Sequence, residues 1–270
     1  MARKWTTTEE SVYRAELNQL YVLENKTIKE AGMVLGLAEQ TIFKRLKRLN
    51  IPILSHLKPN YLRRKKKVTF PDRSEQLAEF FGIMLGDGHV SRFQTVVTLG
   101  NKELEYVEYV SKLMQTLFNT KASIAVRADG YRDVYIGSVL LTDWLKKGGL
   151  VSHKVAAQVG VPSWIFKKKE FMRTFVRGFF DTDGSVYKLK FGIQISFSNK
   201  SLPLLEGVQR MLFELKYRPS VVGEKSLYLT RRNEVQRFFE EIRPANIKHV
   251  RRFESIWGSV GTEVVKRDAL

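Results

Sequence analysis

The chain has no cysteine, few histidines and no long apolar run, and each absence excludes a class of protein. Without cysteine, disulfide bonds, zinc–thiolate fingers and thiol nucleophiles are all excluded. The four histidines, at positions 56, 89, 153 and 249, form no cluster with the spacing of metal ligands. No apolar run approaches the ~20 residues that a membrane-spanning helix needs, and the first residues, MARKWTTTEES, lack the apolar segment of an export signal. We therefore expect an intracellular protein of the cytoplasm or nucleoid, with an organelle as the alternative, and no membrane partner.

Positive charge, in contrast, is in large excess. Lys and Arg number 46 against 28 Asp and Glu, so the 270 residues carry a net charge of +18 and a pI of about 10.0. This excess favours a phosphate-bearing partner, because bound cations release the counterions condensed on nucleic acid. An apolar content of 43% is typical of a folded protein. A basic structural protein without chemistry remains the alternative at this level.

Residues 11–50 show the apolar periodicity of helices. Thr27 and Glu30 form a capping box, Gly36 ends the helix that follows, and a second helix is expected from Glu39. This layout predicts a helix-turn-helix in a domain at 1–57, with a plain three-helix bundle as the alternative. The apolar positions are Val12, Leu17, Leu20, Tyr21, Ile28, Ala31, Val34, Leu35, Ile42, Leu46 and Leu49, and the expected DNA-reading residues are Gln40, Thr41, Lys44 and Arg45.

Residues 58–72 form a basic linker by composition. Pro59 precedes a run of five cations, which repel one another unless an anion lies alongside. We expect the run to follow a DNA backbone, although a simple tether fits the composition equally well. Its members are Arg63, Arg64, Lys65, Lys66 and Lys67.

A nine-residue motif then occurs twice, as FFGIMLGDG from Phe80 and as VRGFFDTDG from Val176. Each copy is an apolar run that ends in an acid and a glycine, which predicts a buried helix with a carboxylate at its end. Two such helices side by side would bring Asp87 and Asp183 together. In a chain this basic, paired carboxylates suggest a metal site that faces a polyanion.

The motifs open two copies of one pattern, αββαββα, in domains at 73–162 and 163–258, before a C-terminal tail at 259–270. We therefore predict an α+β fold of two pseudo-symmetric repeats after a small all-α domain. Expected later strands are 121–127, 132–138, 218–222 and 226–230, and expected closing helices are 139–147 and 232–242.

Alternation along the strands predicts one core face and one polar face, which could fit the major groove of DNA. Ile124 and Val126 are expected to face the core. The expected groove-facing residues are Lys121, Arg127, Gln194, Ser196 and Tyr228.

The two motifs and the repeat around each resemble the LAGLIDADG homing endonucleases in their monomeric, two-repeat form, over about residues 73–257. The resemblance implies saddle-shaped antiparallel sheets, motif helices packed together, and Asp87 and Asp183 at the scissile phosphates. It also implies Mg²⁺ as cofactor, with Mn²⁺ or Ca²⁺ able to occupy the same sites, and the carbonyls of Gly86 and Thr182 as additional ligands. Basic residues around the family's active site would here be Lys154 and Lys248.

By this resemblance the chain is a monomeric, intron-encoded nuclease that cuts both strands of a long, non-palindromic double-stranded DNA site and leaves short 3′ overhangs. The helix-turn-helix would be an accessory module. A non-cleaving transcriptional regulator and an RNA maturase remain alternatives. An intein is a third, but the chain does not open with a splice nucleophile and ends in RDAL rather than His-Asn.

The chain departs from the family pattern in two places. Leu85 of the first motif stands opposite Asp181 of the second, which we expect to cap a backbone group or to contact DNA. Leu99 and Phe197 stand where the family often has a polar residue. We expect His153 and His249 to pack or to contact phosphate rather than act as bases.

Overall fold

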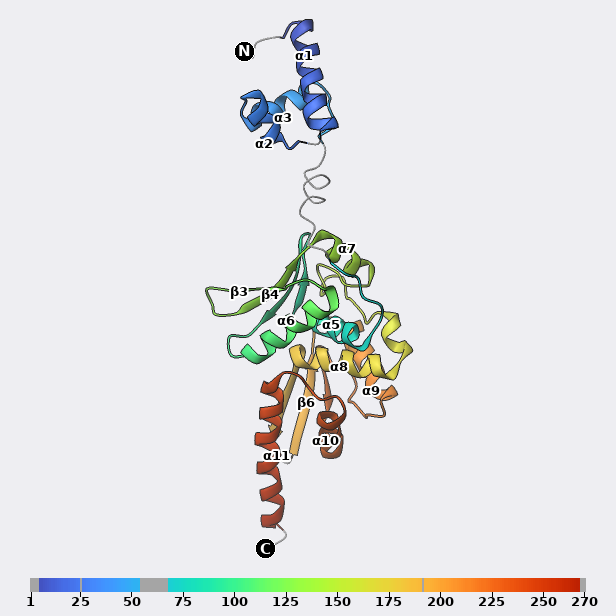
Figure 1. Cartoon of the computed structure of the whole chain (residues 1–270). Helices are drawn as coiled ribbons and strands as arrows, with labels where there is room; N and C mark the ends of the chain where they lie inside the picture. Colours follow the sequence, from blue (N-terminus) through green and yellow to red (C-terminus); the bar gives the residue numbers. More distant parts are fainter. Residues whose placement is uncertain (1–4, 25, 54–67, 191, 268–270) are drawn as a thin grey trace. The chain divides into compact units, whose positions relative to one another are not determined.

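The computed structural model describes residues 5–24, 26–53, 68–190 and 192–267, with side chains up to residue 258 (Figure 1). The chain divides into two compact units, residues 1–65 and 66–270. The basic run predicted to follow DNA, residues 63–67, lies outside the described residues. Residues 68–70 belong to the second unit, where Thr69 donates its backbone N–H to the carbonyl oxygen of Phe118 at 2.9 Å.

The N-terminal unit contains the predicted helix-turn-helix. The Thr27 side chain accepts the backbone N–H of Glu30 at 3.0 Å, Gly36 has the left-handed φ of +63°, and the next helix begins at Glu39, all as predicted. Its helices are α1 (Thr7–Leu17), the π-helical η1 (Asn18–Leu23), α2 (Ile28–Leu35) and α3 (Glu39–Arg48).

The core of this unit is formed by Leu17, Tyr21, Ile28, Ala31, Ile42, Leu46, Leu49 and Ile51. Of the apolar positions in the helical pattern, Val12 and Val34 lie outside this core, since they are 49% and 58% exposed. In α2 the inward positions are Ile28, Ala31 and Leu35, and Val34 falls on the other side of the helix.

The second unit holds the two copies of the repeat (Figure 1). The first copy has the predicted αββαββα order: α5 (Glu75–Leu85), β1 (Gly88–Val90), β2 (Gln94–Leu99), α6 (Leu104–Phe118), β3 (Ser123–Val126), β4 (Arg132–Gly137) and α7 (Val139–Lys147). The second copy follows the 3₁₀-helix η2 (Ser163–Lys167) and comprises α8 (Lys169–Asp183), β5 (Gly184–Leu189), β6 (Gly192–Ser198), α9 (Leu202–Glu214), β7 (Ser226–Leu229) and α10 (Arg232–Glu241). A final helix, α11 (Ile247–Arg267), was not predicted and runs through most of the segment expected to be a tail.

The strand predicted at 218–222 is wrong, since this described segment forms no strand. Pro219 has no backbone N–H to give to a ladder. Arg218 donates its N–H to the carboxylate of Glu234 at 3.1 Å, and Tyr228 donates its N–H to the Ser220 hydroxyl at 3.1 Å instead of to a backbone carbonyl. Ser220 does donate its backbone N–H to the Tyr228 carbonyl oxygen at 2.8 Å, but with Pro219 and these two side-chain contacts the ladder does not continue.

Both sheets are antiparallel within the described residues, in the orders β1-β2-β4-β3 and β5-β6-β7. Val97 lies opposite Val134, and Ile195 opposite Leu229, on buried faces covered by helices. The register places Ile124 and Val126 on the core side of the first sheet, but they are 48% and 65% exposed, so the prediction that they are core residues is wrong. In Figure 1 the β3–β4 hairpin extends beyond the helices that cover the sheet.

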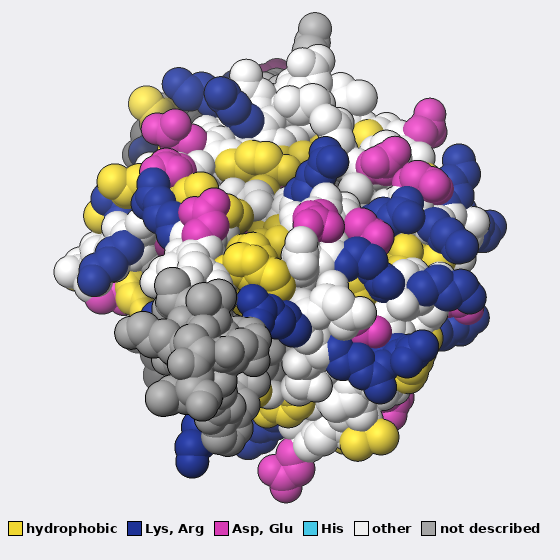
Figure 2. Space-filling model, turned by 90° about the horizontal axis from the view of Figure 1, so that it is seen from below, with side chains coloured by type: hydrophobic (Ala, Val, Ile, Leu, Met, Phe, Trp, Pro, Cys, Tyr) yellow, Lys and Arg dark blue, Asp and Glu magenta, His cyan; other side chains and the backbone are white. Residues whose placement is uncertain are grey.

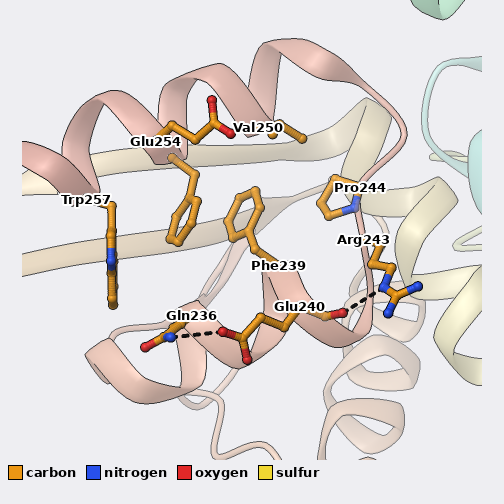
Figure 3. A pocket seen from close by; sticks show the side chains of 9 residues that line it. Gln236, Phe239, Glu240, Arg243, Pro244, Val250, Glu254 and Trp257 are labelled. Carbon is orange, nitrogen blue, oxygen red and sulfur yellow. Dashed lines mark hydrogen bonds between the residues drawn. The ribbon is translucent and has the colours of Figure 1, made fainter.

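Helix α11 packs against α10 through aromatic rings. Phe239 of α10 stacks on Phe253 of α11 with ring centres 4.1 Å apart, and Trp257 continues the row. Beside these rings is an open cavity of about 440 Å³ with a rim that includes Glu240 and Arg243 (Figure 3). The packing buries Ile256 and attaches the inner half of α11 to the second copy.

The surface in Figure 2 carries Lys and Arg side chains over much of its area, with Asp and Glu between them. On this face the positive charge is therefore spread out rather than gathered into one patch. No helix in the described part of the chain is long and apolar enough to cross a membrane.

Candidate active site

Helices α5 and α8 lie backbone to backbone, because glycine occupies the positions where they touch. A Cβ added to Gly82 would lie 2.8 Å from the backbone nitrogen of Phe179, and one added to Gly178 would collide with the carbonyl of Glu79. Only glycine fits such an approach without displacing the partner backbone. The expected packing of the two motif helices against each other is confirmed.

A buried ion pair that the sequence did not reveal lies in the same interface. The Glu79 carboxylate, 1% exposed, pairs with Arg177 of α8 and accepts a hydrogen bond from the Tyr109 hydroxyl at 2.6 Å. Burial raises the pKa of Tyr109 well above its usual range, so this hydroxyl stays a donor. One acid of α5 is thereby held by both α8 and α6.

The two predicted carboxylates meet at the end of this helix pair. Asp87 follows Gly86 at the end of α5, and Asp183 is the last residue of α8. Gly86 lies against Thr182, and a Cβ added to it would be 3.4 Å from the carboxyl carbon of Asp183. The helix ends therefore bring the acid of one copy to the backbone of the other.

Both carboxyls hold protons more tightly than free aspartate. Burial raises the pKa of Asp183 to about 7, and the negative charge of Asp87 adds to the effect, while a 2.6 Å hydrogen bond from the Asn199 amide opposes it. Burial also raises the pKa of Asp87, against the nearby positive charges of Lys154 and Lys248, although its side chain still reaches the surface. A cation between the two carboxylates would relieve their repulsion.

The two predicted lysines lie near these acids but have different partners. The Lys154 ammonium donates to the carbonyl oxygens of Met84 at 3.0 Å, Leu85 at 3.1 Å and Gly86, at the end of α5. Burial lowers the pKa of Lys154, while Asp183 and Asp87 oppose that shift. The Lys248 ammonium forms instead a 2.7 Å ion pair with Glu103.

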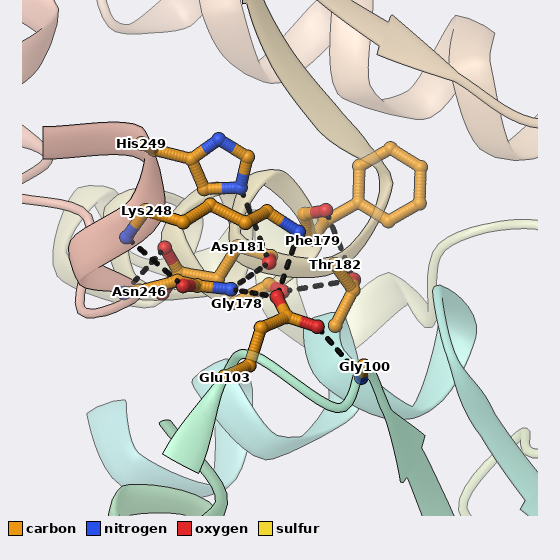
Figure 4. Close-up of polar contacts among 9 residues, drawn as sticks. All are labelled: Gly100, Glu103, Gly178, Phe179, Asp181, Thr182, Asn246, Lys248 and His249. Atoms are coloured by element: carbon orange, nitrogen blue, oxygen red, sulfur yellow. Dashed lines mark hydrogen bonds and ion pairs between the residues drawn. The ribbon is translucent and has the colours of Figure 1, made fainter. Parts of the chain in front are cut away.

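Asp181 lies in a buried network at the end of α8 (Figure 4). Its carboxylate accepts the backbone N–H groups of Ala245 at 2.9 Å and Asn246 at 3.0 Å, just before α11 begins. Burial raises its pKa to about 8. The expectation that it caps a backbone group is confirmed, and with 0% exposure it does not contact DNA.

Asn246 and His249 complete this network (Figure 4). The Asn246 amide donates to the Asp181 carbonyl at 3.0 Å and to Glu103 at 2.7 Å. His249 packs on Phe180 with ring centres 4.7 Å apart, and burial lowers its pKa to about 4. The predicted packing role of His249 is confirmed. His153 is exposed, and its role in packing or in phosphate contact stays a prediction.

Asn199 and Glu103 are site residues that were missed. Leu99 and Phe197 are buried in the core, and the polar residue comes two positions after Phe197, at Asn199. The segments NKEL and NKSL, which follow the second strand of each copy, contained the signal. Glu103 stands where the second copy has Ser201, which is a further difference between the copies.

The predicted DNA-reading residues of α3 differ in accessibility. Gln40 and Lys44 are exposed, and Thr41 is half-buried. The Arg45 guanidinium lies 4.0 Å from the ring centre of Tyr13 and 5.7 Å from that of Trp5, so α1 holds it in place.

On the sheets, Lys121 and Arg127 are exposed and Gln194 and Tyr228 are half-buried. The prediction that Ser196 lies on an accessible face is wrong, because Ser196 is 2% exposed. It sits in the middle strand of its sheet, directly between Ser185 and Tyr228.

The donor set at the helix ends fits a small, hard cation. Within the described residues no group of three or more His, Cys, Asp or Glu side chains is arranged to hold a metal ion. Asp87 and Asp183, with the backbone carbonyls of Gly86 and Thr182, nevertheless offer oxygen atoms only. Mg²⁺ is typically bound by few carboxylates and keeps several waters.

Comparisons with known proteins bear on the second copy most directly. The LAGLIDADG-like domain family matches residues 170–243. The replication factor C small subunit of Methanocaldococcus jannaschii is 30% identical over 118 residues, which are 43% of this chain and 6% of that protein. The glutamine–fructose-6-phosphate aminotransferase of the same organism is 25% identical over 121 residues, which are 44% of this chain and 11% of that protein. The chain thus spans 6% and 11% of the length of these two curated relatives.

Among solved structures, the homing endonuclease I-DmoI in complex with DNA and Mn has a TM-score of 0.47 at 19% identity, over 62% of this chain and 96% of that one. The N-terminal LAGLIDADG domain of DUF199/WhiA has a TM-score of 0.47 at 16% identity, over 64% of this chain and 83% of that one. The family match includes almost all of α8, with Asp183 at its end, and the strands and helices that follow it. Residues 170–243, most of the second copy, therefore form a LAGLIDADG-like domain.

Proposed function

We propose that this chain is a site-specific DNA endonuclease that hydrolyses one phosphodiester bond in each strand and leaves short 3′ overhangs. The observation that carries the proposal is the meeting of Asp87 and Asp183 at the ends of two helices packed through glycine. Carboxylates at a helix C-terminus oppose the helix dipole, and here burial and the negative charge of Asp87 also raise the pKa of Asp183. A structural role alone gives no reason to place such a group twice.

The residues around the acids have distinct parts in this proposal. Asp87 and Asp183, with the carbonyls of Gly86 and Thr182, would hold Mg²⁺, which when bound lowers the pKa of a water and stabilises charge on the leaving oxygen. Asn199 orients the Asp183 carboxylate through its 2.6 Å hydrogen bond. The positive charge of Lys154 lies beside Asp87, where it would stabilise the negative charge that develops on the phosphate during cleavage.

The rest of the chain would supply the DNA contacts. The net charge of +18 favours binding to phosphates, and the two sheets present unlike side chains on their uncovered faces. Unlike halves suit a long, non-palindromic site bound by a single chain. Gln40 and Lys44, exposed on α3, would add contacts outside the site bound by the sheets.

The curated relatives are consistent with a unit that acts independently. They are named for different activities, one as a replication factor subunit and the other as an aminotransferase, and the shared stretch is a small part of each. The shared stretch therefore accounts for neither activity.

A non-cleaving transcriptional regulator is the second candidate, and one observation favours it. The Lys154 ammonium binds the Gly86 carbonyl, which is a position that a metal ion would share in a nuclease. A lysine that served permanently as the cation there would leave DNA binding without cleavage.

Incubation of the full chain with a randomised double-stranded DNA library and Mg²⁺, followed by sequencing of the cut ends, tests the proposal. We expect cut molecules that share one asymmetric sequence and end in short 3′ overhangs. Specific binding with no cutting in Mg²⁺ or Mn²⁺ would instead support the regulator.

A further inference from the structure

Three side chains form a closed hydrogen-bonded ring on the uncovered face of the first sheet. Arg127 donates through Nε to Asp133 Oδ2 at 2.8 Å and through one terminal nitrogen to Thr98 Oγ1 at 3.1 Å. Thr98 donates its hydroxyl proton to Asp133 Oδ1 at 2.7 Å. Each of the three groups thus contacts the other two, and the plane of the guanidinium is fixed.

The strand register places this ring on the face away from the core. Asp133 of β4 lies opposite Thr98 of β2 and Ala125 of β3, whereas the buried pair Val97 and Val134 belongs to the other face. The Arg127 side chain is 47% exposed and that of Asp133 20%. One edge of the Arg127 guanidinium is therefore bound within the ring, while about half of the side chain is exposed to solvent.

The charge of the ring argues against a phosphate contact. Asp133 neutralises Arg127, and hydrogen bonds from Arg127 and Thr98 lower the pKa of Asp133 despite its partial burial, so the carboxylate stays ionised. A cation that is already paired releases few counterions when it reaches a phosphate. The ring uses Nε and one hydrogen of Nη2, which leaves the outer edge, the second hydrogen of Nη2 and the hydrogens of Nη1, for an outside acceptor.

That outer edge matches one base. Guanine presents two acceptors, O6 and N7, side by side in the major groove, and a bidentate arginine is the commonest specific contact to it. Asp133 also fixes the orientation of the guanidinium, which cannot rotate without breaking the ring. Bases whose acceptors are placed differently from those of guanine are therefore disfavoured.

We propose that Arg127 reads a guanine in the half-site bound by the first sheet, with Asp133 and Thr98 as the residues that position it. The proposal rests on the proposed DNA binding and adds the base and the half-site. Within the described residues, the matching face of β5, β6 and β7 has no Lys or Arg, and its polar positions include Ser185, Tyr187, Gln194 and Tyr228. The guanine contact therefore marks one half-site only and sets the orientation of the chain on its target.

The test is selection of bound sequences from a randomised DNA library by the full chain in Ca²⁺, followed by affinity measurements at several salt concentrations. We expect wild type to require guanine at one position of one half-site. Arg127→Ala should weaken that preference by about 10-fold or more, the scale of one bidentate contact, and replacing this guanine by 7-deazaguanine should weaken wild type but not Arg127→Ala. Asp133→Asn and Thr98→Val should weaken the preference less, and not at all in the Arg127→Ala background.

Lys121 provides a matched control in the same region. It is exposed and forms no hydrogen bond or ion pair within the described residues. Lys121→Gln should reduce the slope of log affinity against log salt by about 0.9 and leave the guanine preference unchanged. Arg127→Ala should leave the slope unchanged and weaken the guanine preference.

Two results would overturn the proposal while leaving sequence-specific binding in place. A loss of salt slope in Arg127→Ala as large as in Lys121→Gln would make Arg127 a phosphate contact. An equal loss of affinity for all sequences in Asp133→Asn and Thr98→Val, with lower thermal stability, would make the ring a structural link. A wild-type chain with no sequence preference would overturn the proposed function itself.

Discussion

The ends of α5 and α8 carry the same acid and glycine, yet they are stabilised in different ways. At the end of α5, the charged ammonium of Lys154 takes three backbone carbonyls. At the end of α8, the neutral amide of Asn246 donates to a backbone carbonyl and His249 contacts it, while Lys248 pairs with Glu103. The motif thus determines where the acids lie, and the segment after each closing helix determines the charge around them.

One motif position explains much of this difference. Asp181 accepts two backbone N–H groups just before α11, and Leu85 at the same position of the first motif offers no acceptor. Residues 151–158 of the first copy form turns where the second copy begins a long helix. A single acid in a buried helix can therefore fix the start of another helix far along the chain.

The largest difference between the two helix ends should appear in the cleavage rate when each lysine is replaced in turn. Lys154→Met should slow DNA cleavage by about 10²-fold, since a charge held beside the reacting phosphate is lost. Lys248→Met should slow it by less than about 10-fold, because Glu103 already neutralises the Lys248 charge in an ion pair. Single-turnover cleavage of a supercoiled plasmid that carries the selected site measures both rates. Equal losses, or a larger loss for Lys248→Met, would show that the two helix ends do not differ in this way.

A smaller effect is expected from giving the second motif the residue of the first. Asp181→Leu leaves the N–H groups of Ala245 and Asn246 without their acceptor and should destabilise the second unit by about 2 kcal/mol. Leu85→Met is the matched control and should cost less than about 1.5 kcal/mol. Urea unfolding followed by tryptophan fluorescence reports on this unit through Trp144, Trp164 and Trp257. A variant Asp181→Leu as stable as wild type would mean that the capping bonds do not stabilise this helix end.

The last effect concerns pH, and at the end of α8 one source of it is His249. His249 has a folded-state pKa of about 4, lowered by burial and by Lys248, against an unfolded value of about 6.5. The unfolded chain therefore binds a proton that the folded chain does not, and stability is lost as the pH falls from about 6.5 to about 4, by at most about 1.4 kcal/mol per pH unit.

His249→Phe keeps a ring against Phe180 but does not titrate. The stability difference between wild type and this variant, measured by urea unfolding from pH 7.5 to pH 4.5, should shift against wild type as the pH falls. A difference that is constant with pH would show that His249 has the same pKa in the folded chain as in the unfolded chain.

Sequence patterns correctly predicted the features that depend on residues close together in the chain. The capping box at Thr27, the glycines of the motif helices and the αββαββα order of the first copy are all confirmed. Alternation along β3 correctly assigned Ile124 to the core side, but not its exposure, because exposure depends on how far the covering helices reach. The predicted strand at 218–222 failed although Pro219 was a visible warning.

The site was predicted in its acids but not in its supporting contacts. Asp87 and Asp183 follow from a local pattern that repeats, whereas Glu103, Asn246 and Lys248 meet only because α11 packs beside the start of α6. Contacts between residues more than a hundred positions apart leave no periodic trace in one sequence. The repeated segments NKEL and NKSL could have pointed to Asn199, since a repeat outside the core positions is itself a signal.

Strand-by-strand cleavage of the selected DNA site by wild type, Asp87→Asn and Asp183→Asn tests most directly whether the two helix ends form one nuclease site. We predict that each variant loses cleavage of at least one strand by about 10²-fold or more, with DNA affinity in Ca²⁺ within about 3-fold of wild type, less than 1 kcal/mol. If both variants cut both strands at the wild-type rate, the paired aspartates are not the catalytic centre.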